Sequence, residues 1–206
     1  DVTGVQTCAL PIYCTRTGVG TGAGALQRYV QQTTGWDEAL MNGSSISGKL
    51  HRDTGLARAL ATLFQDLEQK LQLRRPVNVY LAGGMAVHLY TGNRFTTDVD
   101  AEFDARLLLP NDLTVTAKME NGSEQLIFLD TNYNPTFALM HEDYQVDAIP
   151  VDIGTTMLRL HVLSPVDLAV SKLSRFAAND QADIVALVSA GLASGEAIAS
   201  RAREAL

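Results

Sequence analysis

The sequence predicts an α/β fold, in which a sheet flanked by helices is followed by a C-terminal helical segment. Two observations point to this class. A helix-like apolar repeat over 53–73 runs into a strand pattern over 77–82, and after further strand-like segments the pattern becomes helical from residue 164. Of the 206 residues, 46% are hydrophobic and 19% are charged, so the chain can bury the core of one domain.

Composition argues against two classes of protein. No apolar run approaches the ~20 residues that a membrane-spanning helix needs, so we expect no membrane partner. The net charge of −7 argues against general affinity for the nucleic acid backbone, which is bound through lysine and arginine. The two cysteines, Cys8 and Cys14, give no disulfide framework, and without a signal peptide nothing indicates secretion. We therefore expect a cytoplasmic protein.

Three parts of the chain are predicted: a leader over 1–50, a core over 51–163 and a helical segment over 164–206. Residues 2–12 resemble the conceptual translation of a sequencing-library adapter and are set aside as a tag would be. Two glycine-rich segments of the leader are rejected as nucleotide sites. The first lacks a preceding strand, and in the second Leu50 stands where a P-loop needs serine or threonine.

An amphipathic helix is expected to open the core. Apolar residues recur at steps of three and four over 56–71, after Asp53 or Thr54 as the cap. Pro76 disfavours helix in the residue before it, so the helix ends there. Such a helix usually covers a sheet.

A strand, a glycine turn and a second helix come next. The strand over 77–82 leads into Gly83 and Gly84, whose missing Cβ atoms let the backbone approach a ligand closely. A helix begins over 85–90.

Asp98 and Asp100 then alternate with apolar residues. If 98–103 forms one strand, its period of two puts both carboxylates on one face. Adjacent like charges cost stability unless a cation lies between them, so the pair is a candidate metal site.

The remaining core is predicted from weaker patterns. Residues 106–121 indicate a helix or an irregular connection. Strands are expected over 125–129, 136–140, 144–153 and 157–163, with a hairpin over 152–156.

The helical segment has a strong start signal. Ser164 is the expected cap, followed by Pro165 at the first helical position and Asp167 three residues after the cap. This helix is expected to reach Phe176, and two more should follow and pack on the sheet as an appendage. In the second, Asp180 and Asp183 are interpreted as cap and surface residues.

These motifs together resemble the DNA polymerase β-type nucleotidyltransferase superfamily. The glycine pair followed by Asp98-x-Asp100 is its signature, and Arg94-x-Thr96-x-Asp98-x-Asp100 is similar to bacterial toxin–antitoxin and abortive-infection nucleotidyltransferases. The segment 164–183, with Lys172, resembles the helical region that follows the sheet there. More narrowly, the chain from residue 56 to about 206 resembles a group of uncharacterised bacterial nucleotidyltransferases.

The resemblance implies a mixed sheet flanked by helices and a magnesium-dependent transfer. Two Mg²⁺ ions would bridge Asp98 and Asp100, and a nucleotide would pass from an NTP to a hydroxyl on RNA, a protein or a small molecule. The family usually supplies a third carboxylate as metal ligand and base. Asp147 and Asp152 are the candidates for it, with Asp147 preferred because it lies within a predicted strand.

The resemblance also implies a substrate site. The residues expected to contact the nucleotide are Gly83, Gly84, Arg94, Thr96 and Lys172. Arg94 could instead order its loop or pair with Asp98, and Lys172 could be an ordinary solvated lysine. A toxin–antitoxin setting would add a cognate antitoxin as partner. The alternative function is a binding or regulatory module that has kept the fold and lost turnover.

Overall fold

The structure is a computed structural model that describes residues 50–110 and 112–206. Residues 1–49 of the predicted leader, with its adapter-like residues and the glycines of both rejected segments, lie outside the described residues, whereas its last residue, Leu50, is half-buried and packs against the core. The elements, in chain order, are α2 (Gly55–Leu71), β1 (Val77–Leu81), α3 (Gly83–Thr91), β2 (Asp98–Val99), β3 (Ala101–Phe103), β4 (Thr114–Lys118), β5 (Glu124–Leu129), the 3₁₀ turn η3 (Pro135–Phe137), β6 (Ile149–Pro150), β7 (Leu158–Val162), α4 (Pro165–Ser171), α5 (Ala178–Ser189) and α6 (Gly195–Glu204).

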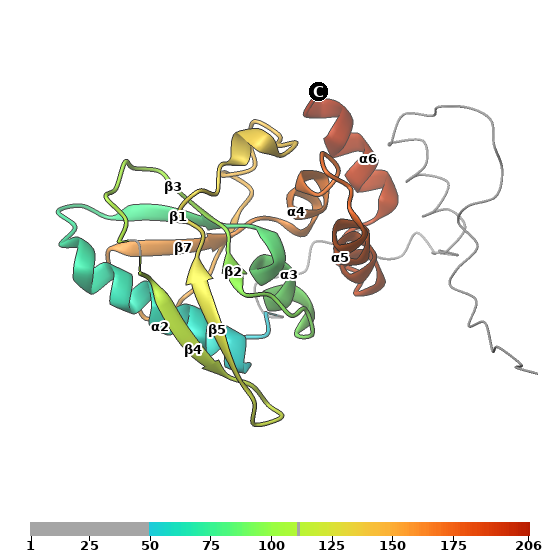
Figure 1. The fold of residues 1–206 in the computed structure, drawn as a ribbon. Coiled ribbons are helices and arrows are strands. Elements are labelled where there is room, and N and C mark those ends of the chain that lie inside the picture. Colours follow the sequence, from blue (N-terminus) through green and yellow to red (C-terminus); the bar gives the residue numbers. More distant parts are fainter. Residues whose placement is uncertain (1–49, 111) are drawn as a thin grey trace, which may run out of the picture.

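The strands form two mixed sheets (Figure 1). In the first, of order β3-β1-β7-β6, β1 runs parallel to β7 and antiparallel to β3. In the second, of order β2-β5-β4, β2 runs parallel to β5 and β5 antiparallel to β4. The chain passes from the second sheet to the first at Asp100, between β2 and β3. The expected α/β fold with a mixed sheet flanked by helices is confirmed.

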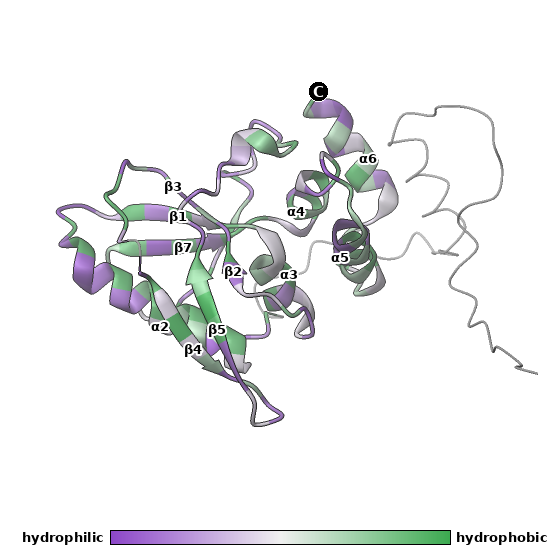
Figure 2. Ribbon diagram, viewed as in Figure 1, coloured by the Kyte–Doolittle hydropathy of each residue, from purple (hydrophilic) through white to green (hydrophobic). Residues whose placement is uncertain are grey.

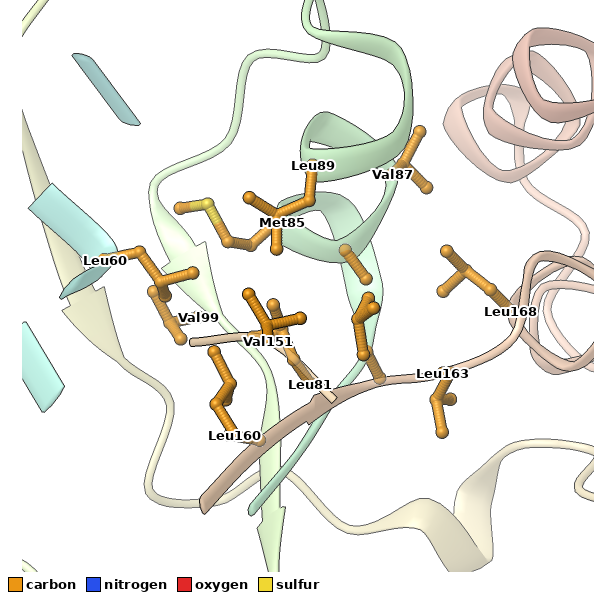
Figure 3. Packing of buried hydrophobic residues seen from close by; sticks show 14 of the residues in the cluster. Leu60, Leu81, Met85, Val87, Leu89, Val99, Val151, Leu160, Leu163 and Leu168 are labelled. Atoms are coloured by element: carbon orange, nitrogen blue, oxygen red, sulfur yellow. The ribbon is translucent and has the colours of Figure 1, made fainter. Parts of the chain in front are cut away.

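The first helix follows its sequence pattern closely. Thr54 caps α2 by accepting a hydrogen bond from the Ala57 N–H, and hydrophilic and hydrophobic residues alternate along the helix (Figure 2). Its apolar stripe packs against β4 and, at Leu60, points toward Met85 of α3 and Val99 of β2 (Figure 3). This packing fixes β2, and with it the two aspartates, against the core.

Helices α4 and α5 pack against α3 and share its core, and α6 packs against α4. Val87 of α3 and Leu168 of α4 are fully buried and belong to one continuous apolar cluster with the two sheets (Figure 3). Ser164 accepts the Asp167 N–H at 3.1 Å, as predicted for a cap, but α4 ends at Ser171 rather than near Phe176. At Phe176 the backbone has φ +48°, a left-handed conformation incompatible with a continuing helix.

Three expected elements differ from those observed. The second half of 106–121 is the strand β4, whose Thr and Val residues are β-branched. The expected strand over 136–140 is replaced by η3, because Pro135 begins a turn and the Asn134 side chain accepts the Thr136 N–H. Only Ile149–Pro150 of the expected strand 144–153 pairs, although the predicted hairpin between β6 and β7 is present.

No helix among the described residues is both long and apolar enough to cross a bilayer.

Candidate active site

The glycine pair lies directly against the second aspartate. Gly83 has φ +61°, and a Cβ atom there would stand 1.7 Å from Oδ2 of Asp100. A Cβ on Gly84 would stand 2.9 Å from the Thr96 hydroxyl oxygen. The Ala82 N–H also bonds the Asp100 carbonyl at 2.9 Å. Because neither glycine has a Cβ, the Asp100 carboxylate can lie against Gly83 and the Thr96 hydroxyl against Gly84 at the start of α3.

Asp98 and Asp100 lie on consecutive short strands rather than on the single strand predicted. Burial still alternates, with Val99 and Ala101 buried between more accessible carboxylates. Asp98 is exposed and accepts the Thr97 hydroxyl at 2.6 Å.

Asp100 lies deeper, and burial raises the pKa of its carboxyl. The positive charges of Lys172 and Arg175 oppose this rise in the pKa, whereas the negative charges of Asp130 and Asp98 add to it. The site is thus a partly buried cluster of negative charge with cations on one side.

Asp130 is a third carboxylate that the sequence reading missed. Parallel pairing of β2 with β5 sets Asp98 beside Phe128 and Val99 beside Leu129, and the Asp130 N–H continues the ladder to the Val99 carbonyl at 3.0 Å. Asp130 is therefore the neighbour of Asp100, which agrees with its effect on the pKa of Asp100. The available signal was an aspartate directly after the predicted strand 125–129.

The two predicted third carboxylates make other contacts. Asp147 accepts a bond from Arg201 of α6 at 2.5 Å, and Arg201 also pairs with Asp167 at 2.7 Å. Asp152 accepts the Gly154 N–H at 3.0 Å within its own turn. Among residues 50–110 and 112–206, no three His, Cys, Asp or Glu side chains form a group that could hold a metal, so neither Asp147 nor Asp152 completes a metal site with Asp98 and Asp100.

Lys172 lies in a buried ion-pair network. It is 8% exposed, and its ammonium lies 2.9 Å from Asp183 and 3.8 Å from Asp180, both almost completely buried. Arg175 binds Asp180 through two 2.8 Å bonds, and Arg94 binds Asp183 at 2.6 Å. Asp183 is therefore not a surface residue, and Arg94 pairs with it rather than with Asp98. The N-cap of α5 is Ala177 rather than Asp180, which lies at the third helical position, is buried and accepts the Ala177 N–H at 3.0 Å.

His88 holds the loop that carries Arg94 and Thr96. Its Nδ1 lies 2.9 Å from the Arg94 carbonyl, and its Nε2 lies 2.7 Å from the Thr54 hydroxyl. Burial lowers the pKa of His88, which favours the neutral ring. Because a carbonyl only accepts, Nδ1 carries the proton and Nε2 accepts from Thr54. The sequence reading gave this histidine no role.

An open pocket of about 440 Å³ begins at Ala101, the residue after Asp100. Its wall includes Ala101 and Glu102 of β3 and, from the turn after β5, Asp130 and Tyr133. A bound molecule there would reach the carboxylate side of the site.

The donor set suits Mg²⁺ in combination with phosphate. Among the described residues, no three His, Cys, Asp or Glu side chains form a group that could hold a metal alone. Mg²⁺ is commonly held by one or two carboxylates together with substrate phosphates, and Asp98 and Asp100 can supply that pair. Asp100 lies against Gly83, whose missing Cβ leaves the backbone accessible, and this arrangement fits a metal-bound phosphate.

Comparison with known proteins identifies the family of the chain. The sequence profile of the family described as "Nucleotidyltransferase of unknown function (DUF6036)" matches residues 58–205. No curated protein matches significantly. A crystal structure of an antigenic nucleotidyltransferase-like protein from Paracoccidioides brasiliensis is similar, with 16% identity and a TM-score of 0.39 over 68% of this chain and 78% of that one. On the profile match, which spans both aspartates and the C-terminal helices, this chain belongs to that nucleotidyltransferase family.

Proposed function

We propose that the protein is a magnesium-dependent nucleotidyltransferase that moves a nucleotide from an NTP to a hydroxyl acceptor. One observation carries the proposal: the Asp100 carboxylate occupies the space that the missing Cβ of Gly83 leaves at the start of α3, two residues after Asp98 in the chain. A helix N-terminus presents unpaired N–H groups to an anion, so phosphate and metal-binding carboxylates meet at one point.

The residues have distinct tasks in this proposal. Asp98 and Asp100 would hold Mg²⁺, which supplies charge neutralisation for the phosphates when bound. The backbone of Gly83 and Gly84 would orient the triphosphate, and the buried network around Lys172 keeps positive charge nearby. Asp130 is the nearest candidate to accept the acceptor's proton, because it neighbours Asp100 and lines the adjoining pocket.

The acceptor is an RNA, a protein or a small molecule. A toxin–antitoxin or defence setting, with a cognate antitoxin as partner, rests on the motif resemblance alone.

A labelling assay tests the proposal. The purified chain is incubated with Mg²⁺, a cell extract and each α-labelled NTP separately, which also names the donor and the size of the acceptor. Asp98→Ala combined with Asp100→Ala should abolish labelling, while Asp66→Ala, an exposed aspartate on α2, should label like wild type. Equal labelling by the double variant would rule out catalysis by this site.

A second candidate is a binding module without turnover. It is favoured by the fact that no three-carboxylate metal group forms among residues 50–110 and 112–206, and that Asp147 is held by Arg201. It predicts NTP binding without pyrophosphate release. Asp130→Asn separates the two candidates: an enzyme should lose transfer and keep NTP binding, whereas a binding module has no transfer to lose.

A further inference from the structure

The face of the second sheet that carries Asp98 also carries an exposed aromatic side chain. Phe128 is the direct neighbour of Asp98 in the parallel β2–β5 register, and such neighbours point to the same face about 4.8 Å apart. Phe128 is 41% exposed and Leu126, two residues earlier on the same face, is 59% exposed. On β4, Thr116 and Thr114 lie opposite these two. We call these four residues the stacking face.

The stacking face is the side of the sheet that α2 does not cover. The alternate residues Ile127 and Leu129 are buried, and α2 packs against the sheet on that buried side. In Figure 2, the second part of β5 is coloured as hydrophobic, and the strand lies in front of α2. Single exposed apolar residues are common and need no function. Here, however, the exposed ring adjoins a proposed metal ligand, so a ligand bound at Asp98 necessarily lies next to it.

The chemistry of the face selects a flat aromatic ring. An aromatic side chain stacks on any nucleobase through its π face, and leucine adds apolar contact. The polar groups of the face are two threonine hydroxyls. Because a hydroxyl can either donate or accept a hydrogen bond, these groups do not select one nucleobase over another. A nucleotide whose phosphate is held at Asp98 would therefore have this surface beside it, because Phe128 is the register neighbour of Asp98.

We propose that Phe128 and Leu126 bind the nucleobase of a nucleotide whose phosphate is held at Asp98 and Asp100. The inference rests on the proposed function, because the phosphate site fixes the position of the base. Binding is expected to be tolerant of base identity. The base belongs either to the donor NTP or to a nucleotide acceptor.

Calorimetric titration of the full chain in Mg²⁺ tests this with defined probes: each of the four NTPs, inorganic tripolyphosphate and a short oligoadenylate. Phe128→Ala should weaken all four NTPs, or the oligoadenylate, by about fivefold to a hundredfold, and leave tripolyphosphate unchanged. Phe128→Trp should retain the affinity, whereas Phe128→Leu should lose much of it. Phe137→Ala, which removes an 82% exposed ring elsewhere, is the control.

The outcomes separate the two proposals. Weaker NTP binding assigns the base to the donor, and weaker oligoadenylate binding alone assigns it to the acceptor. If tripolyphosphate binds but Phe128→Ala weakens neither nucleotide probe, the stacking proposal is overturned and the phosphate site stands. If wild type binds neither NTPs nor tripolyphosphate, both proposals fail. A change from dimer to monomer in Phe128→Ala by light scattering would make the face a self-interface and also overturn the proposal.

Discussion

Replacing Lys172 by methionine tests whether the buried ion network is structural. The Lys172 ammonium lies 2.9 Å from Asp183 and 3.8 Å from Asp180, and both carboxylates are almost fully buried. Methionine keeps most of the aliphatic stem, so the change removes charge with little loss of packing. What remains is two buried negative charges with fewer cations.

The expected cost follows from what is left unpaired. Removing one partner of a buried ion pair typically costs about 3–5 kcal/mol. Arg94 still pairs with Asp183 at 2.6 Å, and Arg175 still pairs with Asp180 at 2.8 Å, so each carboxylate retains one cation. We therefore expect a loss near ~3 kcal/mol, which lowers Tm by roughly 6–12 °C in a chain of this size.

Urea unfolding measures the change in the free energy of unfolding. Lys70→Met is the matched control, because Lys70 is an exposed lysine 4.0 Å from Asp112 and should change stability by less than about 0.5 kcal/mol. If Lys172→Met lowers the free energy of unfolding by less than about 1 kcal/mol, the ion pairs are not structural, because removing one partner of a buried ion pair destabilises a protein by more than that. Adding Asp183→Asn should recover part of the stability. NTP affinity is measured in both variants. If Lys172→Met lowers it and the added Asp183→Asn does not restore it, Lys172 also contacts the nucleotide.

Three further predictions concern single contacts. Gly83→Ala should abolish transfer and lower Tm, because the new Cβ would collide with Asp100. The control is Gly122→Ala, which is also at positive φ but in open space and should lower the free energy of unfolding by only about 1 kcal/mol. Equal losses of Tm in the two variants would refute the collision. Burial alone would raise the pKa of Glu68, but backbone N–H bonds at the start of β7 lower it below 4.5, so its contribution to stability is present above that pH and lost as pH falls. Glu68→Gln should therefore cost about 1–2 kcal/mol at neutral pH and less in acid, as urea titrations across pH would show. Ser164→Ala should cost about 1 kcal/mol by removing the α4 cap; an unchanged urea midpoint would contradict that.

Elements with a local chemical signal were predictable from the sequence. The steps of three and four in α2, the cap at Ser164 and the β-branched strand before Gly83 each specify their conformation within a few residues. The resemblance carried by the glycine pair and Asp98-x-Asp100 implied that both belong to one site, and Gly83 does lie against Asp100.

Features that depend on long-range pairing were not predictable in this way. Asp130 approaches Asp100 only because β5 pairs in parallel with β2, and no local pattern announces which strands pair. Asp147 was preferred on the assumption of a regular strand, which the turns after His141 replace. Asp183 has the sequence environment of an exposed helical residue, and its burial follows from α5 packing on α3.

That packing also changes the status of the C-terminal helices. An appendage would touch the core through a few surface residues, yet Asp183 of α5 binds Arg94, which lies in the loop leading to Asp98. The same loop is held from the other side by His88, so its conformation is fixed jointly by the core and by α5. Lys172 and Arg175 then bring the positive charge that opposes the raised pKa of Asp100. The pKa of Asp100 is therefore set partly by residues that follow β7, and the site belongs to both halves of the described chain.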